Sequence, residues 1–231
     1  MIAPKLFRAL GRVHLWMGVA VGFQVVIWFV SGLFMVWFPI DEVRGSHLRA
    51  NQPPASLNWP ADALSAATLA EQLGDPVMSL EARMLLNEPV WLVRTHTGRG
   101  LYDARTGEAL GLIDQDQASE IARTRYAGRG EMSDIRLLAS PPREAGLSTP
   151  AWAAVFSGPD RATLYVNAQT GDLRAVRTPL WRTFDWFWGL HIMDWSTREN
   201  FNSWWVKMTT LLAVLFALTG VGLTVIRLWP R

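Results

Sequence analysis

Two apolar segments, one near each end of the chain, are long enough to cross a lipid bilayer. The first, residues 15–38, contains no charged side chain, and its 24 residues would extend about 36 Å as a helix. The apolar core of a bilayer is about 30 Å thick. The second, residues 204–228, has Lys207 near its start, from where the ammonium group reaches the interface. The sequence therefore predicts two transmembrane helices.

The first apolar segment is predicted to be an uncleaved anchor, because it is too long for the apolar region of a signal peptide and no small-residue cleavage site follows it. Basic side chains lie on the terminal side of both segments: Lys5, Arg8, Arg12, Arg227 and Arg231. The positive-inside rule then places both termini, including residues 1–14, in the cytoplasm. We therefore expect an inner-membrane protein whose residues 39–203 lie in the periplasm of a Gram-negative cell.

Composition narrows the class of protein further. The 13 tryptophans favour the boundary between membrane and water. With no cysteine, the chain forms no disulfide, no iron–sulfur cluster and no covalent c-type haem attachment. The formal net charge of +2 is too small to indicate nucleic-acid binding. A bilayer is therefore the expected partner, together with other copies or other membrane subunits.

The segment between the apolar helices reads as a small α+β domain. Residues 61–74 and 116–126 have helical patterns, and residues 74–85 are compatible with a strand. Further strands are predicted from runs rich in β-branched and aromatic residues: 90–95, 101–103, 163–167 and 173–178.

Two turns in this segment repeat each other. The sequence "DARTGE" occupies 103–108 and "NAQTGD" occupies 167–172, with Gly107 and Gly171 supplying a positive φ. Because the flanking strands also match, residues 55–178 are predicted to be a tandem repeat of one module related by a pseudo-twofold axis. The alternative is coincidence, since Thr-Gly turns are common.

The helix–strand–strand unit with its "D-x-x-T-G-E" hairpin resembles the PepSY domain. The end segments "RVHLWMGVAVGFQVVIWFVSGLFM" and "WRTFDWFWGLHIMDWSTRENFN" resemble the PepSY-associated transmembrane family. The resemblance implies a PepSY-like domain over 39–180, followed by an aromatic interfacial helix over 181–203. Larger relatives have four transmembrane helices, and some are reductases of iron–siderophore complexes that carry b-type haem. This chain has only two apolar helices, so the haem ligands of those relatives do not all carry over.

One histidine, His191, lies within an aromatic run. If residues 183–195 are helical, five side chains lie within about 60° of it around the helix: Phe184, Phe187, Trp188, Asp194 and Trp195. Asp194 would then accept a hydrogen bond from the second ring nitrogen, as carboxylates do for metal-bound imidazoles. Together with the resemblance, this predicts His191 as an axial ligand of haem b. The alternative is an amphipathic helix at the interface, with tryptophan anchors.

A second histidine, His14, precedes the first apolar segment and is also a candidate haem ligand. The same helix face carries Gly18, Gly22 and Gly32, and small residues let backbones approach closely. This predicts self-association through the glycine face. The alternative is that the small residues only pack the two helices of one chain together.

The predicted topology separates the histidines. His14 and His191 lie on opposite sides of the bilayer and therefore cannot bind one iron. A haem at His14 needs a second chain, whereas a haem at His191 has either His47 or a second His191 as its other ligand. His96, in a predicted strand or turn, is interpreted as structural or exposed.

These observations leave three functions open. The first is a haem b protein that carries electrons across the membrane to periplasmic ferric iron or an iron–siderophore, as a component of a reductase. The second is a non-catalytic, membrane-anchored PepSY module, and the third is an accessory subunit of a larger membrane complex. No nucleotide-binding loop, nucleophile–base pair or zinc motif is present in the sequence. Electrons would therefore arrive from a partner or from the quinol pool.

Overall fold

The computed structural model describes residues 4–51 and 57–228. Within it the chain forms two compact units, which are treated separately below. The helical unit comprises Met1–Pro39 and Arg182–Arg231, and the α+β unit comprises Ile40–Trp181. The predicted α+β domain between two terminal apolar helices is thus confirmed, and its strands form two separate sheets.

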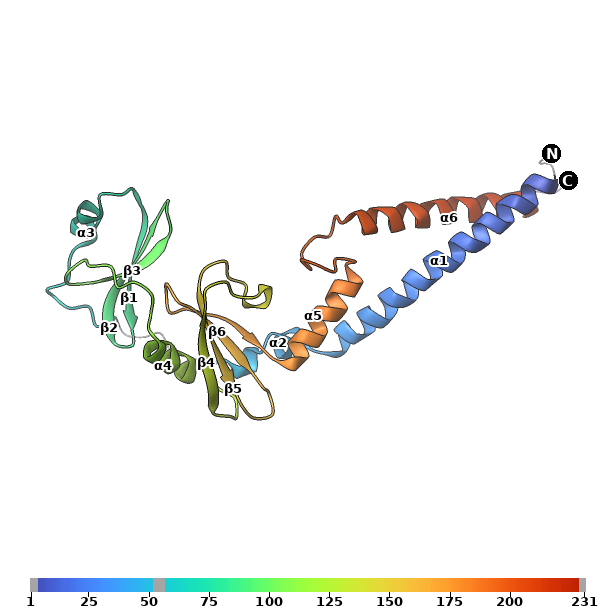
Figure 1. The fold of residues 1–231 in the computed structure, drawn as a ribbon. Coiled ribbons are helices and arrows are strands. Elements are labelled where there is room, and N and C mark those ends of the chain that lie inside the picture. The colour runs from blue at the N-terminus through green and yellow to red at the C-terminus, as the bar shows by residue number, and fades with distance from the viewer. Residues whose placement is uncertain (1–3, 52–56, 229–231) are drawn as a thin grey trace. The chain divides into compact units, whose positions relative to one another are not determined.

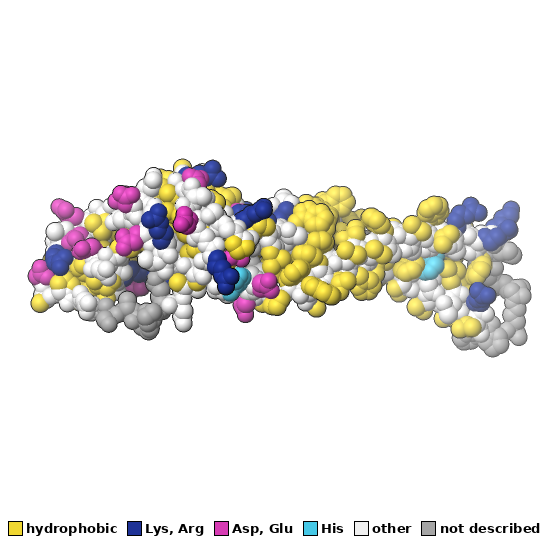
Figure 2. Space-filling view, turned by 90° about the horizontal axis from the view of Figure 1, so that it is seen from below, with side chains coloured by type: hydrophobic (Ala, Val, Ile, Leu, Met, Phe, Trp, Pro, Cys, Tyr) yellow, Lys and Arg dark blue, Asp and Glu magenta, His cyan; other side chains and the backbone are white. Residues whose placement is uncertain are grey.

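The helical unit consists of α1 (Pro4–Trp37), the end of α5 (Pro179–His191) and α6 (Trp204–Leu228). Figure 1 shows α1 and α6 side by side and antiparallel, with the start of α1 and the end of α6 at the same end. Both helices are long and apolar enough to cross a membrane, and their described large apolar side chains are exposed or half-buried, none of them fully buried. Figure 2 shows this apolar surface, with Lys and Arg side chains gathered near the chain termini. Such a surface needs lipid or protein around it.

Helices α1 and α6 pack closely at a glycine. A Cβ added to Gly18 would lie 2.9 Å from Cε2 of Phe216, so only glycine allows this ring to lie against α1. Gly32 faces the ring of His191, where an added Cβ would lie 3.5 Å from Cε1, an ordinary van der Waals contact. At Gly22 nothing lies within 4 Å of an added Cβ. Two of the three glycines predicted to mediate self-association therefore pack against this chain itself, and Gly22 alone stays open.

The first half of the α+β unit is a helix followed by a three-stranded antiparallel sheet in the order β1-β2-β3. Its elements are α3 (Ala66–Leu73), β1 (Val77–Leu85), β2 (Glu88–Thr95) and β3 (Arg99–Asp103). Ser65 caps α3 by accepting a hydrogen bond from the amide of Thr68 at 3.1 Å. Gly74 ends the helix in the left-handed conformation, as is common after a last turn.

The second half is a helix followed by a four-stranded antiparallel sheet in the order β4-β5-β6-β7. Its elements are α4 (Gln115–Arg125), β4 (Met132–Leu138), β5 (Ala151–Phe156), β6 (Thr163–Asn167) and β7 (Leu173–Arg177). Asp114 and Gln117 form a capping box at the start of α4. Two short helices, α2 (Ile40–Val43) and η1 (Ser46–Leu48), precede the first half, and η2 (Arg143–Ala145) lies between β4 and β5.

One apolar core joins the two halves of the α+β unit. Val90 and Leu101 from the first sheet pack in the same buried cluster as Ile121 from α4 and Leu164 from β6. The indole of Trp152 lies in this cluster and donates a hydrogen bond to the carbonyl of Ile113 at 3.0 Å. Loops between the halves are therefore held in fixed positions around a common core.

The two similar turns adopt the same conformation. In the first, the amide of Gly107 donates to the carbonyl of Asp103 at 3.0 Å, and in the second the amide of Gly171 donates to the carbonyl of Asn167 at 2.9 Å. The two glycines have φ of 74° and 71°, where a Cβ would be strained. The shared sequence pattern thus marks one turn conformation used twice.

Candidate functional site

The imidazole of His14 is held between α1 and α6. Its ring stacks on Phe216, with centroids 4.4 Å apart and planes 8° apart. Its Nδ1 lies 2.9 Å from Oγ1 of Thr219. A Cβ added to Gly220 would lie 3.0 Å from Cε1 of His14, so this position needs glycine for the ring to lie against α6. His14 belongs to the third turn of α1 (Pro4–Trp37), so this helix begins before the predicted apolar segment 15–38.

The imidazole of His191 is held against the second half of α1. Its Nδ1 lies 3.0 Å from Oγ of Ser31, a side chain that is only 1% exposed. The indole of Trp28 donates to the carbonyl of His191 at 2.9 Å, which fixes the last turn of α5 on α1. His14 and Ser31 are 17 residues apart on one helix, so the two histidines lie at levels separated by about 26 Å.

Both hydroxyl partners are already committed as donors. Oγ of Ser31 donates to the carbonyl of Ile27 at 2.7 Å, and Oγ1 of Thr219 donates to the carbonyl of Leu215 at 2.9 Å. A hydroxyl has only one proton to donate, so a hydroxyl that donates to its helix carbonyl accepts the hydrogen bond that it shares with a histidine. We infer that Nδ1 is the protonated nitrogen of His14 and of His191.

This tautomer leaves Nε2 of each histidine with a free lone pair. Among the described residues, neither His14 nor His191 makes a hydrogen bond through Nε2. Metal-binding imidazoles commonly have one nitrogen on the metal and the other donating to a fixed acceptor. The two sites therefore share one arrangement. A hydroxyl that bonds a carbonyl of its own helix orients the histidine, and the other ring nitrogen of the histidine is available to a ligand.

Asp194 does not orient His191, and the sequence prediction on this contact is wrong. Its carboxylate caps the loop that follows α5, accepting backbone hydrogen bonds from Ser196, Thr197, Glu199 and Asn200. The hydroxyls of Ser196 and Thr197 donate to it as well. These bonds, that of the Thr197 hydroxyl first, hold the pKa of Asp194 well below its usual value.

The loop forms because α5 ends at His191 instead of continuing through residue 195. The amide of Asp194 donates to the carbonyl of Gly189 at 3.1 Å and that of Met193 donates to Leu190 at 3.3 Å, while Met193 has a φ of 53°. This is the hydrogen-bond pattern of a Schellman motif. Residues 192–203 therefore form a loop and not part of an interfacial helix.

The predicted aromatic trough around His191 is only partly present. Within the described part of the chain no aromatic ring stacks on His191, and Trp195 lies beyond the helix, 53% exposed. The indole of Trp188 donates to the carbonyl of Arg198 and packs on Phe201, both in or next to the loop. Phe184 lies one turn before Trp188 on α5 and is half-buried. The aromatic residues here mainly hold the loop to α5.

The other two histidines lie in the α+β unit. His47 is in η1 and His96 is in the turn between β2 and β3, and both are exposed. The expectation that His96 is structural or exposed agrees with this position. A site shared by His47 and His191 stays a prediction, as do the ligand roles of His14 and His191.

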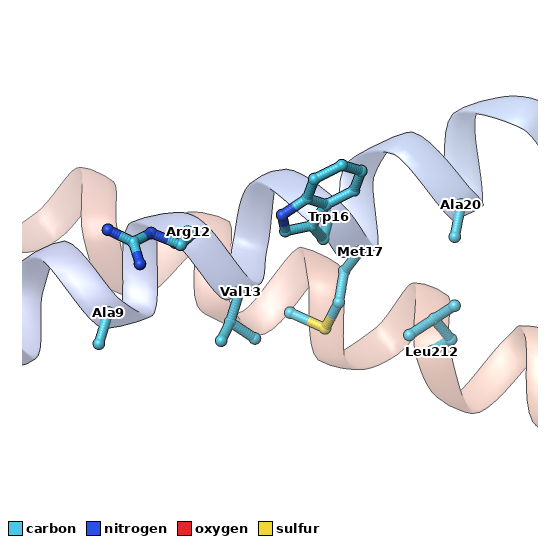
Figure 3. A pocket seen from close by; sticks show the side chains of 7 residues that line it. All are labelled: Ala9, Arg12, Val13, Trp16, Met17, Ala20 and Leu212. Atoms are coloured by element: carbon cyan, nitrogen blue, oxygen red, sulfur yellow. The ribbon is translucent and has the colours of Figure 1, made fainter.

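An open groove of about 520 Å³ lies on the helical unit near the level of His14, but neither histidine lines it. Figure 3 shows that its wall is mostly α1, with Val13 and Met17 pointing towards α6. Its lining is Ala9, Arg12, Val13, Trp16, Met17, Ala20 and Leu212. Apart from Arg12 these side chains are mainly apolar, as suits a surface in contact with lipid chains.

Each of the two histidines could hold the iron of a haem b through its free ring nitrogen. Each imidazole is oriented by a hydroxyl on an apolar helix, and its ring packs against a glycine, Gly220 for His14 and Gly32 for His191. Among the described residues no group of three or more His, Cys, Asp or Glu side chains converges to hold a metal ion. Each histidine would thus be the ligand that one chain contributes at its level.

Two apolar helices long enough to cross a membrane, with an α+β unit between them in the sequence, indicate a membrane-associated protein. The family model for the PepSY-associated TM region matches residues 11–231. The chain belongs to this family, and the resemblance of its end segments is thereby confirmed. No curated protein and no solved structure matches the chain significantly.

Proposed function

We propose that this protein binds haem b in the membrane through His14 and His191 and carries electrons across the bilayer. The observation that supports the proposal most strongly is the shared arrangement of the two histidines, each with Nδ1 held by a hydroxyl that bonds a carbonyl of its own helix and Nε2 without a partner. Haem b, when bound, supplies one-electron transfer.

The protein's own residues would set the ligation. Ser31 and Thr219 keep the proton on Nδ1, so that Nε2 stays available without a change of charge in the apolar region. Phe216 and Gly220 fix the plane of the His14 ring. Trp28 fixes the end of α5, which sets the height of His191 along α1.

We propose that both termini are cytoplasmic and that the α+β unit is periplasmic, in an inner membrane. The support is the group of Lys and Arg side chains at the shared end of α1 and α6. A reporter that is active only in the periplasm should be silent when fused after residue 231 and active when inserted in the exposed β2–β3 turn. The reverse pattern would contradict the orientation.

We propose a homodimer, because one histidine at each level leaves the second axial position to another chain. Of the three glycines on the predicted face of α1, Gly22 is the one with no neighbour within 4 Å of an added Cβ, so Gly22→Leu should leave the fold of one chain intact and weaken association several-fold. Gly18→Leu is the matched contrast, since its side chain would meet Phe216 and disturb α1–α6 packing instead. The oligomeric state of both variants is measured as the mass of the protein in detergent and as the proximity of labelled chains in bilayers. An unchanged dimer in Gly22→Leu would exclude this face.

The electron acceptor that we propose is ferric iron or an iron–siderophore in the periplasm, which would make the protein a reductase component.

We also propose that the two halves of the α+β unit are a tandem repeat of one module. Its support is that the residue before each helix cap makes the same bond to its own turn: Leu64 donates to the carbonyl of Ala104, and Ile113 to that of Ala168, both at 2.8 Å.

The test of the haem proposal is a reduced-minus-oxidised spectrum. The protein is expressed with ample haem and with its natural partners, purified in a gentle detergent and reduced with dithionite. We expect the absorbance of low-spin haem b with two nitrogen ligands. A folded protein without haem absorbance would replace the proposal by a membrane-anchored PepSY module or an accessory subunit, and co-purifying proteins would distinguish those two.

A further inference from the structure

A second candidate site lies within the α+β unit, whereas His14 and His191 belong to the helical unit. It is an open groove of about 970 Å³, bounded by the β2–β3 turn, the loop before β5 and the β6–β7 turn. Four arginines from three separate segments line it: Arg49, Arg94, Arg99 and Arg174. Its volume is near the upper end of the usual range for small-molecule sites.

The positive charge of this groove is not balanced by the protein. Among the described residues none of these four arginines pairs with a carboxylate. The one acidic residue in the lining, Asp172, is paired with Arg83 at 2.9 Å and accepts from the hydroxyl of Thr170 at 2.8 Å. Its charge is therefore committed to a cation outside the groove.

Two of the arginines are held close together by the backbone. Arg49 donates to the carbonyl of Arg174 at 3.2 Å, and Nε of Arg174 donates to the carbonyl of Gly146 at 3.1 Å. Burial and the neighbouring charge of Arg174 lower the pKa of Arg49 below its ordinary value. Like charges placed side by side repel, and a bound anion would relieve that repulsion.

The concentration of cations is local and does not reflect a generally basic domain. The α+β unit as a whole has 17 acidic and 14 basic side chains, so its surface is slightly acidic. Neutral donors complete the lining of the groove: Thr95, Thr97, Ser148, Thr149, Asn167 and Gln169. Arginine forks bind carboxylates and phosphates through paired hydrogen bonds.

We propose that this groove binds a small multivalent oxyanion, a soluble molecule with several spaced carboxylate or phosphate groups. A monovalent anion is too small to meet arginines on three walls of the groove. The site is independent of haem, because none of its residues belongs to the helical unit.

The test uses the full chain in an uncharged detergent at low ionic strength. Binding of citrate and of pyrophosphate is measured by titration calorimetry, with acetate as the monovalent comparison. We expect saturable binding of at least one multivalent probe, and the tighter of the two gives the chemical class. Binding should weaken strongly on raising the salt to about 0.15 M, and a bound probe should raise the melting temperature.

Two variants locate the binding. Arg94→Gln with Arg99→Gln should weaken binding about tenfold or more, and neither guanidinium makes a hydrogen bond that the fold needs. Arg136→Gln, an exposed arginine on β4 outside the groove, is the matched control and should bind as the wild type does. A cooperative thermal unfolding transition, measured without any probe, checks that each variant is folded.

The proposal is overturned if no multivalent probe binds saturably, if acetate binds as tightly as citrate and pyrophosphate, if the double variant keeps its affinity, or if Arg136→Gln loses as much. Because binding is measured without haem, a failure here leaves the haem proposal standing, and a protein without haem can still confirm the groove.

Discussion

Alanine in place of His191 should remove the haem that we propose at this residue, and alanine in place of His14 should remove the haem that we propose there. His14 and His191 are the two histidines of the helical unit, so no other imidazole of this unit can replace either of them. Each single variant should keep the spectrum of the remaining site, and the double variant should have none. Pyridine haemochrome assay gives the content, and the reduced spectrum gives the ligation.

The hydroxyl partners permit a finer test of the same idea. Ser31→Ala and Thr219→Val remove the acceptor of Nδ1 without removing the ligand. Loss of such a partner typically lowers metal affinity about 10–100-fold, so we expect weaker haem retention and a shifted midpoint potential. Unaltered retention and potential in both variants would contradict the inferred tautomers.

The controls for these variants come from the same chain. His96→Ala removes an exposed histidine and should leave the spectrum unchanged. Thr224→Val removes a hydroxyl that donates to the carbonyl of Gly220 at 2.9 Å but contacts no histidine. His47→Ala decides whether that residue is the second ligand at the His191 level. Loss of haem from Thr224→Val to the same degree as from Thr219→Val would mean that the effect is only structural.

Hydropathy and turn chemistry predicted the elements of the fold well. The apolar segments became α1 and α6, and the glycines of the two similar turns have the positive φ that their pattern requires. Strands β4 and β5 were not predicted. Periodicity on one segment says which faces are apolar, but it does not say which distant segment covers them.

The candidate sites depended on such distant contacts. Ser31 is 160 residues from His191, and Thr219 is 205 residues from His14, so no local spacing points to either pair. The sequence reasoning chose Asp194 as the partner because it is three residues from His191 on an assumed helix. The helix stops earlier because Met193 takes a left-handed conformation, which the sequence signals poorly when the residue is not glycine.

Replacing Asp194 should release the loop between α5 and α6, and this is the second large effect that we expect. Its two carboxylate oxygens accept from four backbone amides and two hydroxyls between residues 196 and 200. Asp194→Ala leaves all of these donors without their partner, and we expect the melting temperature to fall by roughly 5 °C. Faster proteolysis within 192–203 would locate the change.

Asp194→Asn should be nearly as harmful, because an amide has one acceptor oxygen whereas the loop uses both carboxylate oxygens. Glu199→Ala is the matched control. It removes a carboxylate from the same loop, and the bond of this residue to Asp194 runs through its backbone amide. A similar fall in melting temperature for Glu199→Ala would show that loop charge, and not the Asp194 bonds, is what matters.

The lowered pKa of Asp194 determines how its contribution to the stability of the folded chain changes with pH. A carboxyl with a lower pKa in the folded chain stabilises it fully above the unfolded value of 3.8, and this stabilisation is lost as the pH falls through the lower folded pKa. The gap in melting temperature between wild type and Asp194→Asn should therefore be widest above pH 3.8 and narrow in stronger acid.

Because the loop follows His191 directly, haem retention at that residue should weaken in Asp194→Asn, while the His14 site stays unchanged. A gap that grows in acid, or loss of haem from both sites alike, would contradict this role.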